Sequence, residues 1–264
     1  MADIFLELPD ELMQTLQQRA VAAGVDMETF TRDLIHEGGP SVASTGQHHP
    51  ALQDEPIVKA AEIEVECRRL GYELGWRFMT CPQANAGSAK LLLVGLNPAG
   101  RERHGPSWSQ ELGNAYRMEA WGQSRPGEAP LQRQVLALFE LLKLRDAEVM
   151  SAQYVPFRSP TWADLPRPAD AEIFAERLWR WFKPQLAFER IVCIGKDRPG
   201  KSIARLFEAR LEGSYPVGWG NITADRYRMP DGRPIVALPH LSRFAVFGRS
   251  ASLQALTDLY ELPL

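Results

Sequence analysis

Three short segments carry the polar side chains that are best placed for chemistry. They are the Gly-Leu-Asn-Pro run at residues 95–98, the Gln-Tyr-Val-Pro run at residues 153–156 and the Leu-Pro-His-Leu-Ser-Arg-Phe run at residues 238–244. The amide of Asn97 can orient a water molecule but cannot act as a base, whereas the imidazole of His240 can donate a hydrogen bond to a departing group. These residue types predict a ligand-binding or catalytic edge.

The elements around these segments indicate an α/β fold. Wholly or largely apolar runs, typical of strands buried on both faces of a sheet, occur at residues 91–94, 149–156, 190–195 and 234–238. Helical spacing of apolar residues occurs between and after them, at residues 130–145, 170–186, 201–211 and 250–262. This alternation predicts a three-layer α/β/α domain around a central, mostly parallel sheet of about four strands. Open sheets of this kind bind ligands beyond the carboxyl ends of their strands, where all three polar segments fall.

The chain divides into three parts. Residues 1–38 show a strand, helix, turn, helix pattern that resembles the ribbon-helix-helix fold, a dimer that usually reads DNA. The outward face of this strand would carry Asp3 and Glu7, which DNA phosphates repel, so we predict a homodimerisation or docking module rather than an operator reader. Residues 39–56 form a linker rich in Gly, Ser, Pro, Gln and His. Residues 57–264 form the main domain, which opens with a helix reaching about Leu74.

Composition narrows the class of protein. The net charge is −3, but residues 1–66 carry 13 acidic and 3 basic side chains, whereas residues 157–249 carry 16 basic and 10 acidic ones. The basic excess suits a partner with a phosphate backbone. The sequence has no apolar stretch of membrane-spanning length and no signal-peptide pattern, so we expect a cytoplasmic protein without a membrane partner. The three cysteines are scattered and no ligand cluster is evident, so we expect neither a metal nor another cofactor.

One further stretch of the sequence favours a functional loop, and another matches a phosphate-binding motif without its chemistry. The loop at residues 101–127 is long and too aromatic to be disordered, which favours a functional loop containing Trp108. Residues 195–202 match the phosphate-binding pattern GxxxxGK[ST] between a strand and a helix. Pro199 offers no N–H group to a phosphate and Asp197 would repel it, so a nucleotide-dependent enzyme is the less favoured alternative.

The three polar segments, in this order, resemble the motifs of the uracil-DNA glycosylase superfamily. The match is to the branches with Asn in the first motif, the mismatch-specific and the single-strand-selective enzymes, and it covers roughly residues 57–264. It implies a monofunctional DNA glycosylase that flips a nucleotide out of DNA and hydrolyses its N-glycosidic bond. No lysine stands in the matched motifs to form a Schiff base, so lyase activity is not expected.

The resemblance assigns expected roles to single residues. Asn97 matches the water-positioning residue and His240 the donor to the departing base. The residues expected to bind the base are Gln153, Tyr154, Phe157 and Trp108, and those expected to contact DNA are Arg158, Leu241, Ser242, Arg243 and Phe244. Within the second set, Leu241 and Phe244 are the candidates for a wedge that fills the place of the flipped base, and Arg243 is expected on a phosphate.

Departures from the family pattern leave the base open. Gln153 stands about where uracil-reading members often place Asn, and the last motif is about one residue short. We expect either uracil or a modified, bulkier pyrimidine. Because related glycosylases act on glucosylated hydroxymethylcytosine in phage DNA, the resemblance implies a role in DNA repair or in defence against phage. The alternative from another class is a non-catalytic DNA-binding regulator that acts through residues 1–38.

Overall fold

The computed structural model describes Asp26 and residues 55–262. The chain divides into two compact units, Met1–Glu73 and Leu74–Leu264, and each is described by itself. In the first unit the described residues form helix α3 (Glu55–Arg69). This helix was expected near here, but it stops before Leu74 because the backbone turns left-handed at Gly71, where φ is 75°.

The structure does not test the predictions made for residues 1–38. The ribbon-helix-helix pattern of residues 1–38 and nearly all of the linker lie outside the described residues. The division between the two units places α3 with the first of them, whereas the sequence placed this helix in the domain of residues 57–264. The proposed boundaries are not decided by this division.

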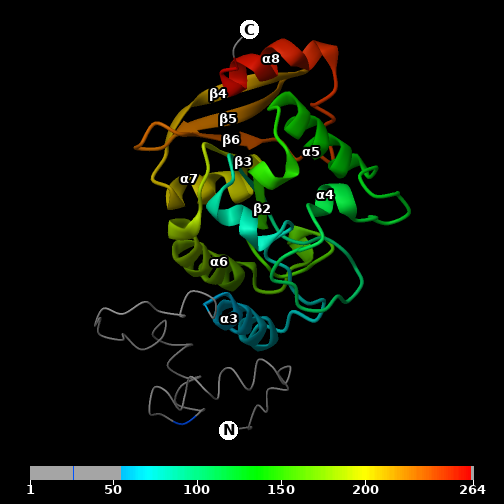
Figure 1. The fold of residues 1–264 in the computed structure, drawn as a ribbon, viewed down its shortest axis with the longest axis vertical. Helices are drawn as coiled ribbons and strands as arrows, with labels where there is room; N and C mark the ends of the chain where they lie inside the picture. Colours follow the sequence, from blue (N-terminus) through cyan, green and yellow to red (C-terminus); the bar gives the residue numbers. More distant parts are fainter. Residues whose placement is uncertain (1–25, 27–54, 263–264) are drawn as a thin grey trace. The chain divides into compact units, whose positions relative to one another are not determined.

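The second unit is built on one six-stranded sheet (Figure 1). Its strands are β1 (Leu91–Gly95), β2 (Val149–Gln153), β3 (Arg190–Ile194), β4 (Arg210–Trp219), β5 (Ile222–Arg228) and β6 (Pro234–Leu238). Their spatial order is β2-β1-β3-β6-β5-β4. The strands β2, β1, β3 and β6 are parallel, and β5 and β4 extend the sheet in antiparallel fashion. The α/β class is therefore confirmed, and the four runs expected to be strands do form strands, which are parallel to one another.

Helices cover both faces of this sheet. They are α4 (Ala115–Met118), α5 (Pro130–Leu141), α6 (Pro168–Phe182), α7 (Ser202–Leu206) and α8 (Ser250–Tyr260). One core joins Leu91 and Leu93 of β1 to Leu138 of α5 and Leu256 of α8. Because side chains alternate along a strand, Leu92 faces the other way, and Figure 1 shows α6 and α7 on that side. Short 3₁₀ turns lie at Gln83–Gly87, Asp146–Glu148, Trp162–Asp164 and Lys183–Gln185.

Two expectations about the sheet region are wrong. The sheet has six strands rather than about four, because β4 and β5 form a hairpin at its edge. The helix expected over residues 201–211 stops at Leu206, since Glu208 takes a left-handed conformation with φ 56° and the chain then enters β4. Pairing of β4 with β5 thus overrides the weak helical spacing at the end of this stretch.

Candidate active site

The parallel strands bring the three polar segments to one edge of the sheet. Gly95 at the end of β1 lies opposite Gln153 at the end of β2, and β3 separates β1 from β6. Neighbouring strands lie about 4.8 Å apart, so Asn97 and His240 follow strands about 10 Å apart. This is the edge at which open α/β sheets bind ligands.

The side chain of Asn97 is fixed by its amide nitrogen. Nδ2 donates to Ser159 Oγ at 2.8 Å and to the carbonyl oxygens of Phe157 and Pro98, both at 3.3 Å. No described residue donates a hydrogen bond to Oδ1 of this half-buried side chain. The amide therefore keeps one acceptor oxygen for a water molecule or a substrate.

Ser159 holds this amide in place, and sequence reasoning missed it. Its side chain is buried, and its hydroxyl donates to the Thr161 carbonyl at 2.8 Å while accepting from Asn97. The backbone N–H of Ser159 donates to the Pro98 carbonyl at 3.1 Å. The only signal in the sequence is that Ser159 follows the second polar segment at a short distance, which places it at the same strand end.

Gln153 brings a buried acceptor to the same edge. The residue is 9% exposed, and its Oε1 atom is buried without a hydrogen-bond partner. A Cβ atom on Gly95 would lie 2.5 Å from Oε1, so the absence of a side chain at residue 95 makes room for this amide. A buried acceptor without a partner costs about 1–3 kcal/mol, which a ligand N–H group recovers.

His240 is the third polar group at this edge and is exposed. Its Nδ1 atom lies 2.7 Å from Ser242 Oγ and accepts from the Ser242 backbone N–H at 3.4 Å. Partial desolvation, and then the charge of Arg243, lower the pKa of His240 below its usual value of 6.5. The lowered pKa favours the neutral ring, and in the tautomer whose Nδ1 accepts from the Ser242 N–H the proton is on Nε2.

The aromatic residues expected to bind the base lie elsewhere or deeper. Phe157 is fully buried with its ring 5.4 Å from that of Phe174, and Tyr154 is 2% exposed. Trp108 packs at the edge of an aromatic cluster, 5.1 Å from Phe78, and its indole N–H donates to Gln83 at 3.0 Å. No described contact joins Trp108 to Asn97. Phe157 and Tyr154 are thus buried, and the expected roles of the three aromatic residues stay predictions.

The residues expected to contact DNA divide by burial. Leu241 is 1% exposed and belongs to the core beneath the sheet edge, so it is not available as a wedge, and this part of the expectation needs correction. Phe244 is half-buried, with its ring 6.4 Å from that of Trp219. Ser242 and Arg243 are exposed on the same turn. Phe244 thus remains the candidate for the wedge.

Arg158 lies against the loop that follows β1. Its Nη1 atom donates to the Ala99 carbonyl, while its Nε atom is buried without a partner. Burial, and then the charge of Arg77, lower the pKa of its guanidinium. The side chain therefore supports the loop after Asn97, and its expected contact with DNA stays a prediction.

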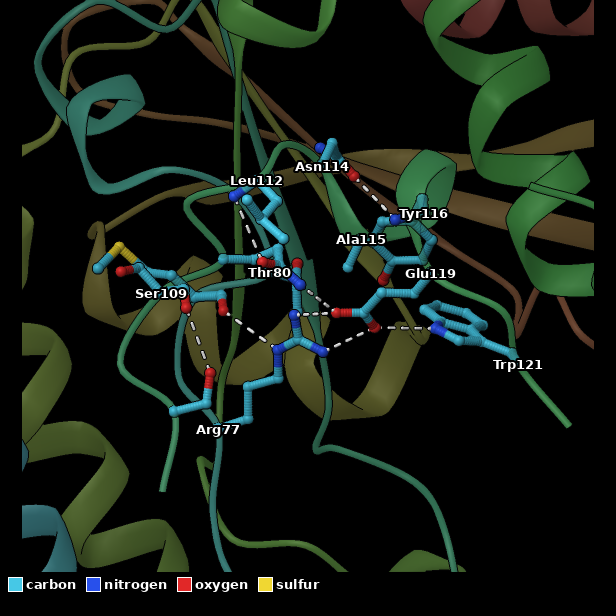
Figure 2. A network of polar contacts seen from close by, with 12 residues as sticks. Arg77, Thr80, Ser109, Leu112, Asn114, Ala115, Tyr116, Glu119 and Trp121 are labelled. Carbon is cyan, nitrogen blue, oxygen red and sulfur yellow. Dashed lines mark hydrogen bonds and ion pairs between the residues drawn. The ribbon is translucent and has the colours of Figure 1, made fainter. Parts of the chain in front are cut away.

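The long loop at residues 101–127 is anchored by a salt bridge between Arg77 and Glu119. The carboxylate of Glu119 accepts hydrogen bonds from both terminal nitrogens of Arg77, at 2.7 and 2.9 Å (Figure 2). Gln110 and Trp121 donate to the same carboxylate at 2.6 and 3.1 Å. Burial alone raises the pKa of Glu119, but Arg77 outweighs it and the pKa lies below its ordinary value. The loop is therefore ordered by its own polar network.

Residues 195–202, which match the pattern of a phosphate-binding loop, form bonds with one another. Residues Lys196–Lys201 form a turn after β3 that is kinked at Arg198, whose backbone is extended, and the Gly200 N–H donates to the Gly195 carbonyl at 3.0 Å. Lys201 pairs with Asp197 at 2.6 Å. The N–H groups of Gly195 and Gly200 and the amine of Lys201 are thus already engaged, which weakens the nucleotide-dependent alternative.

Comparisons with known proteins do not identify the chain. No protein-family model matches it, and no curated protein resembles it significantly. Within residues 55–262 and Asp26, no group of three or more His, Cys, Asp or Glu side chains is arranged to hold a metal ion. None of the helices in this described part has the length and apolarity needed to cross a bilayer.

Proposed function

We propose that this protein is a monofunctional DNA glycosylase. It hydrolyses the N-glycosidic bond of a flipped-out uracil or modified pyrimidine and leaves an abasic site. Three observations support the proposal: the fixed amide of Asn97 with a spare acceptor, the buried amide oxygen of Gln153, and the imidazole of His240 in contact with Ser242, all at one edge of the sheet. The proposal rests on this convergence together with the resemblance of the motifs.

The observation that carries most weight is the unpartnered Oε1 atom of Gln153. Proteins rarely leave a buried acceptor unsatisfied, and such atoms call for an explanation. A pyrimidine placed at the ends of β1 and β2 offers an N–H group from its ring or from an exocyclic amine. This donor satisfies Oε1 only when the base has left the duplex and entered the pocket, so the amide selects a flipped base.

The expected roles of the other two groups follow from their chemistry. Bond cleavage leaves an oxocarbenium-like sugar and an anionic base. The Nε2–H group of neutral His240 donates to an oxygen of the departing base, which stabilises the negative charge. Oδ1 of Asn97 accepts a hydrogen bond from the attacking water and so directs its lone pair at the sugar. Because an amide cannot remove the proton of the water, this proton passes to the departing base anion, and leaving-group stabilisation carries most of the rate.

An excision assay tests this function. The protein is incubated with labelled oligonucleotides that contain uracil, a thymine–guanine mismatch, hydroxymethylcytosine or its glucosylated form, and alkali then reveals abasic sites as strand breaks. We expect breaks on one substrate, and the Asn97→Ala variant should cut at a rate lower by about 100-fold or more. Binding of the same DNA should change little. The substrate that is cleaved also separates repair from defence against phage.

The control is Gln254→Ala, which removes an exposed amide from α8. It should cleave at the wild-type rate. Cleavage by Asn97→Ala at the wild-type rate would refute the site. Absence of breaks on every substrate, with DNA still bound, would favour the non-catalytic regulator instead.

A further inference from the structure

The β4–β5 hairpin, which the sequence reading missed, reaches the same edge as the proposed active site. Asp225 of β5 lies opposite Ala237 of β6, and the two strands are antiparallel. Going back along β5 from Asp225 to Ile222 therefore leads past the carboxyl end of β6, towards the level of His240. The tip of the hairpin, Gly220 and Asn221, is exposed there, and Trp219 is half-buried beside it.

Trp219, beside the hairpin tip, stacks against Arg249 and fixes the orientation of its guanidinium group. The guanidinium carbon of Arg249 lies 4.0 Å from the ring centroid of Trp219, and the ring of Phe244 meets Trp219 edge-on at 74°. A Cβ atom on Gly218 would lie 2.5 Å from the Ala251 carbonyl oxygen, so the hairpin and the start of α8 are in close backbone contact. Trp219 ends β4 and Arg249 immediately precedes α8, so the stacked pair joins two elements whose backbones are in close contact.

The two chain segments that carry this pair contain no acidic residue. The sequence contains no Asp or Glu from residue 213 to 224 or from residue 232 to 257. Asp225, which ends the first of these stretches, is buried and paired with Lys196 at 2.7 Å. Among the described residues neither Arg243 nor Arg249 forms an ion pair. These two guanidinium groups therefore have no carboxylate to satisfy them.

A guanidinium stacked on an indole is suited to a phosphate. Stacking fixes the plane of the group and leaves its N–H edge free, so little side-chain entropy is lost when it binds an anion in bidentate fashion. The other stacked cation at this sheet edge, Arg198 over Trp162, is already paired with Glu172. Charge complementarity therefore distinguishes Arg249 from Arg198 as a site for an anionic partner.

We propose that Arg249, held on Trp219, binds a backbone phosphate of the DNA strand that runs from the base site across the hairpin tip. This inference rests on the proposed function, because it places the phosphate on the strand that carries the excised base. β1 and β4 are four strand spacings apart, about 19 Å, so the phosphate belongs to a nucleotide several positions away from that base. The hairpin thereby extends the DNA-contacting surface beyond the last motif.

Salt-dependent binding tests the proposal without requiring excision. The probe is an unmodified, fluorescently labelled single-stranded oligonucleotide, and its affinity is measured by anisotropy at several salt concentrations. Loss of one phosphate contact in Arg249→Gln should lower the slope of log K against log salt by about 0.7. Affinity at low salt should fall about tenfold, the loss expected for one charge-assisted hydrogen bond. Arg249→Lys keeps the charge and should keep the slope while losing affinity.

The role of Trp219 is tested by a double-mutant cycle. If the indole acts by orienting the guanidinium, then Trp219→Leu weakens binding on its own but adds nothing to Arg249→Gln. A thermal melt of each variant checks that it is folded. Additive losses in the cycle would overturn the orienting role of the indole.

The matched control is Arg210→Gln, at the opposite end of β4. Arg210 is exposed, and no ion pair involves it among the described residues, so this variant loses the same charge about 30 Å away. Equal slope changes in both variants would reduce the effect to overall charge and overturn the phosphate site. The two proposals fail separately. Excision with no effect of Arg249→Gln removes only the phosphate site, whereas a changed slope in a protein that excises no base removes only the glycosylase.

Discussion

At the scale of single residues, the position of Gly95 decides where the Gln153 amide can lie. A methyl group at residue 95 would lie 2.5 Å from Oε1, which is closer than any van der Waals contact. The atom that must move is the end of a flexible side chain, so Gly95→Ala should cost only about 1 kcal/mol of stability. Excision should fall at least about tenfold, because the acceptor that reads the base is displaced. Urea unfolding and the excision assay measure the two effects.

Gly87→Ala is the control for this variant. Gly87 lies in a 3₁₀ turn with no atom within 4 Å of an added Cβ. It should leave both stability and excision near their wild-type values. If Gly95→Ala cleaves as fast as Gly87→Ala, Gln153 does not read the base.

The residue types in the sequence predict which residues share one edge of the sheet, but not which of those residues are buried. Asn97, Gln153 and His240 lie at one edge because parallel strands end there, which alternation in the sequence already implies. The burial of Leu241 could not be predicted, because one turn residue faces the core and the next faces solvent according to how the turn packs. Ser159 was not predicted for a similar reason, because a serine in a sequence does not indicate a role until its hydrogen-bond partners are known.

At the scale of elements, the β4–β5 hairpin shows why an edge strand is hard to predict. β4 has apolar residues at alternate positions towards its end, Tyr215, Val217 and Trp219, but Pro216 and Gly218 lie between them and are uncommon inside strands, and half of the strand is exposed. The sequence does contain a turn signal, the Gly220-Asn221 pair between Trp219 and Ile222, and Gly220 has φ 49° as such turns require. The strands β1, β2, β3 and β6 were predictable because they are buried on both faces.

The close approach of Gly218 to α8 gives a prediction at this scale. Gly218 has φ 71°, and a Cβ atom there would lie 2.5 Å from backbone atoms of Ala251 and Ser252. Gly218→Ala should therefore destabilise the protein by about 3 kcal/mol, from left-handed strain together with displacement of the helix. Gly232→Ala, with φ 87° and open space around it, should cost only about 1 kcal/mol. Urea unfolding of the two variants compares them, and equal losses would show that the hairpin and α8 separate freely.

At the scale of the whole molecule, charge is divided along the chain. Residues 1–54 carry nine acidic and two basic side chains, so their removal changes the net charge from −3 to +4. The three polar groups of the proposed active site all come from the unit Leu74–Leu264. None of these three groups comes from residues 1–54, whose acidic character opposes DNA at low salt.

Deleting residues 1–54 consequently separates the two classes of function. If this part only dimerises or docks, the truncated chain should be a monomer by light scattering and should excise the base within about twofold of the full-length rate. It should also bind unmodified DNA more tightly at low salt, because a net charge of −7 has been removed, and this gain should vanish as salt screens it. A regulator that reads DNA through residues 1–38 gives the opposite result, since its DNA binding disappears with the deletion at every salt concentration.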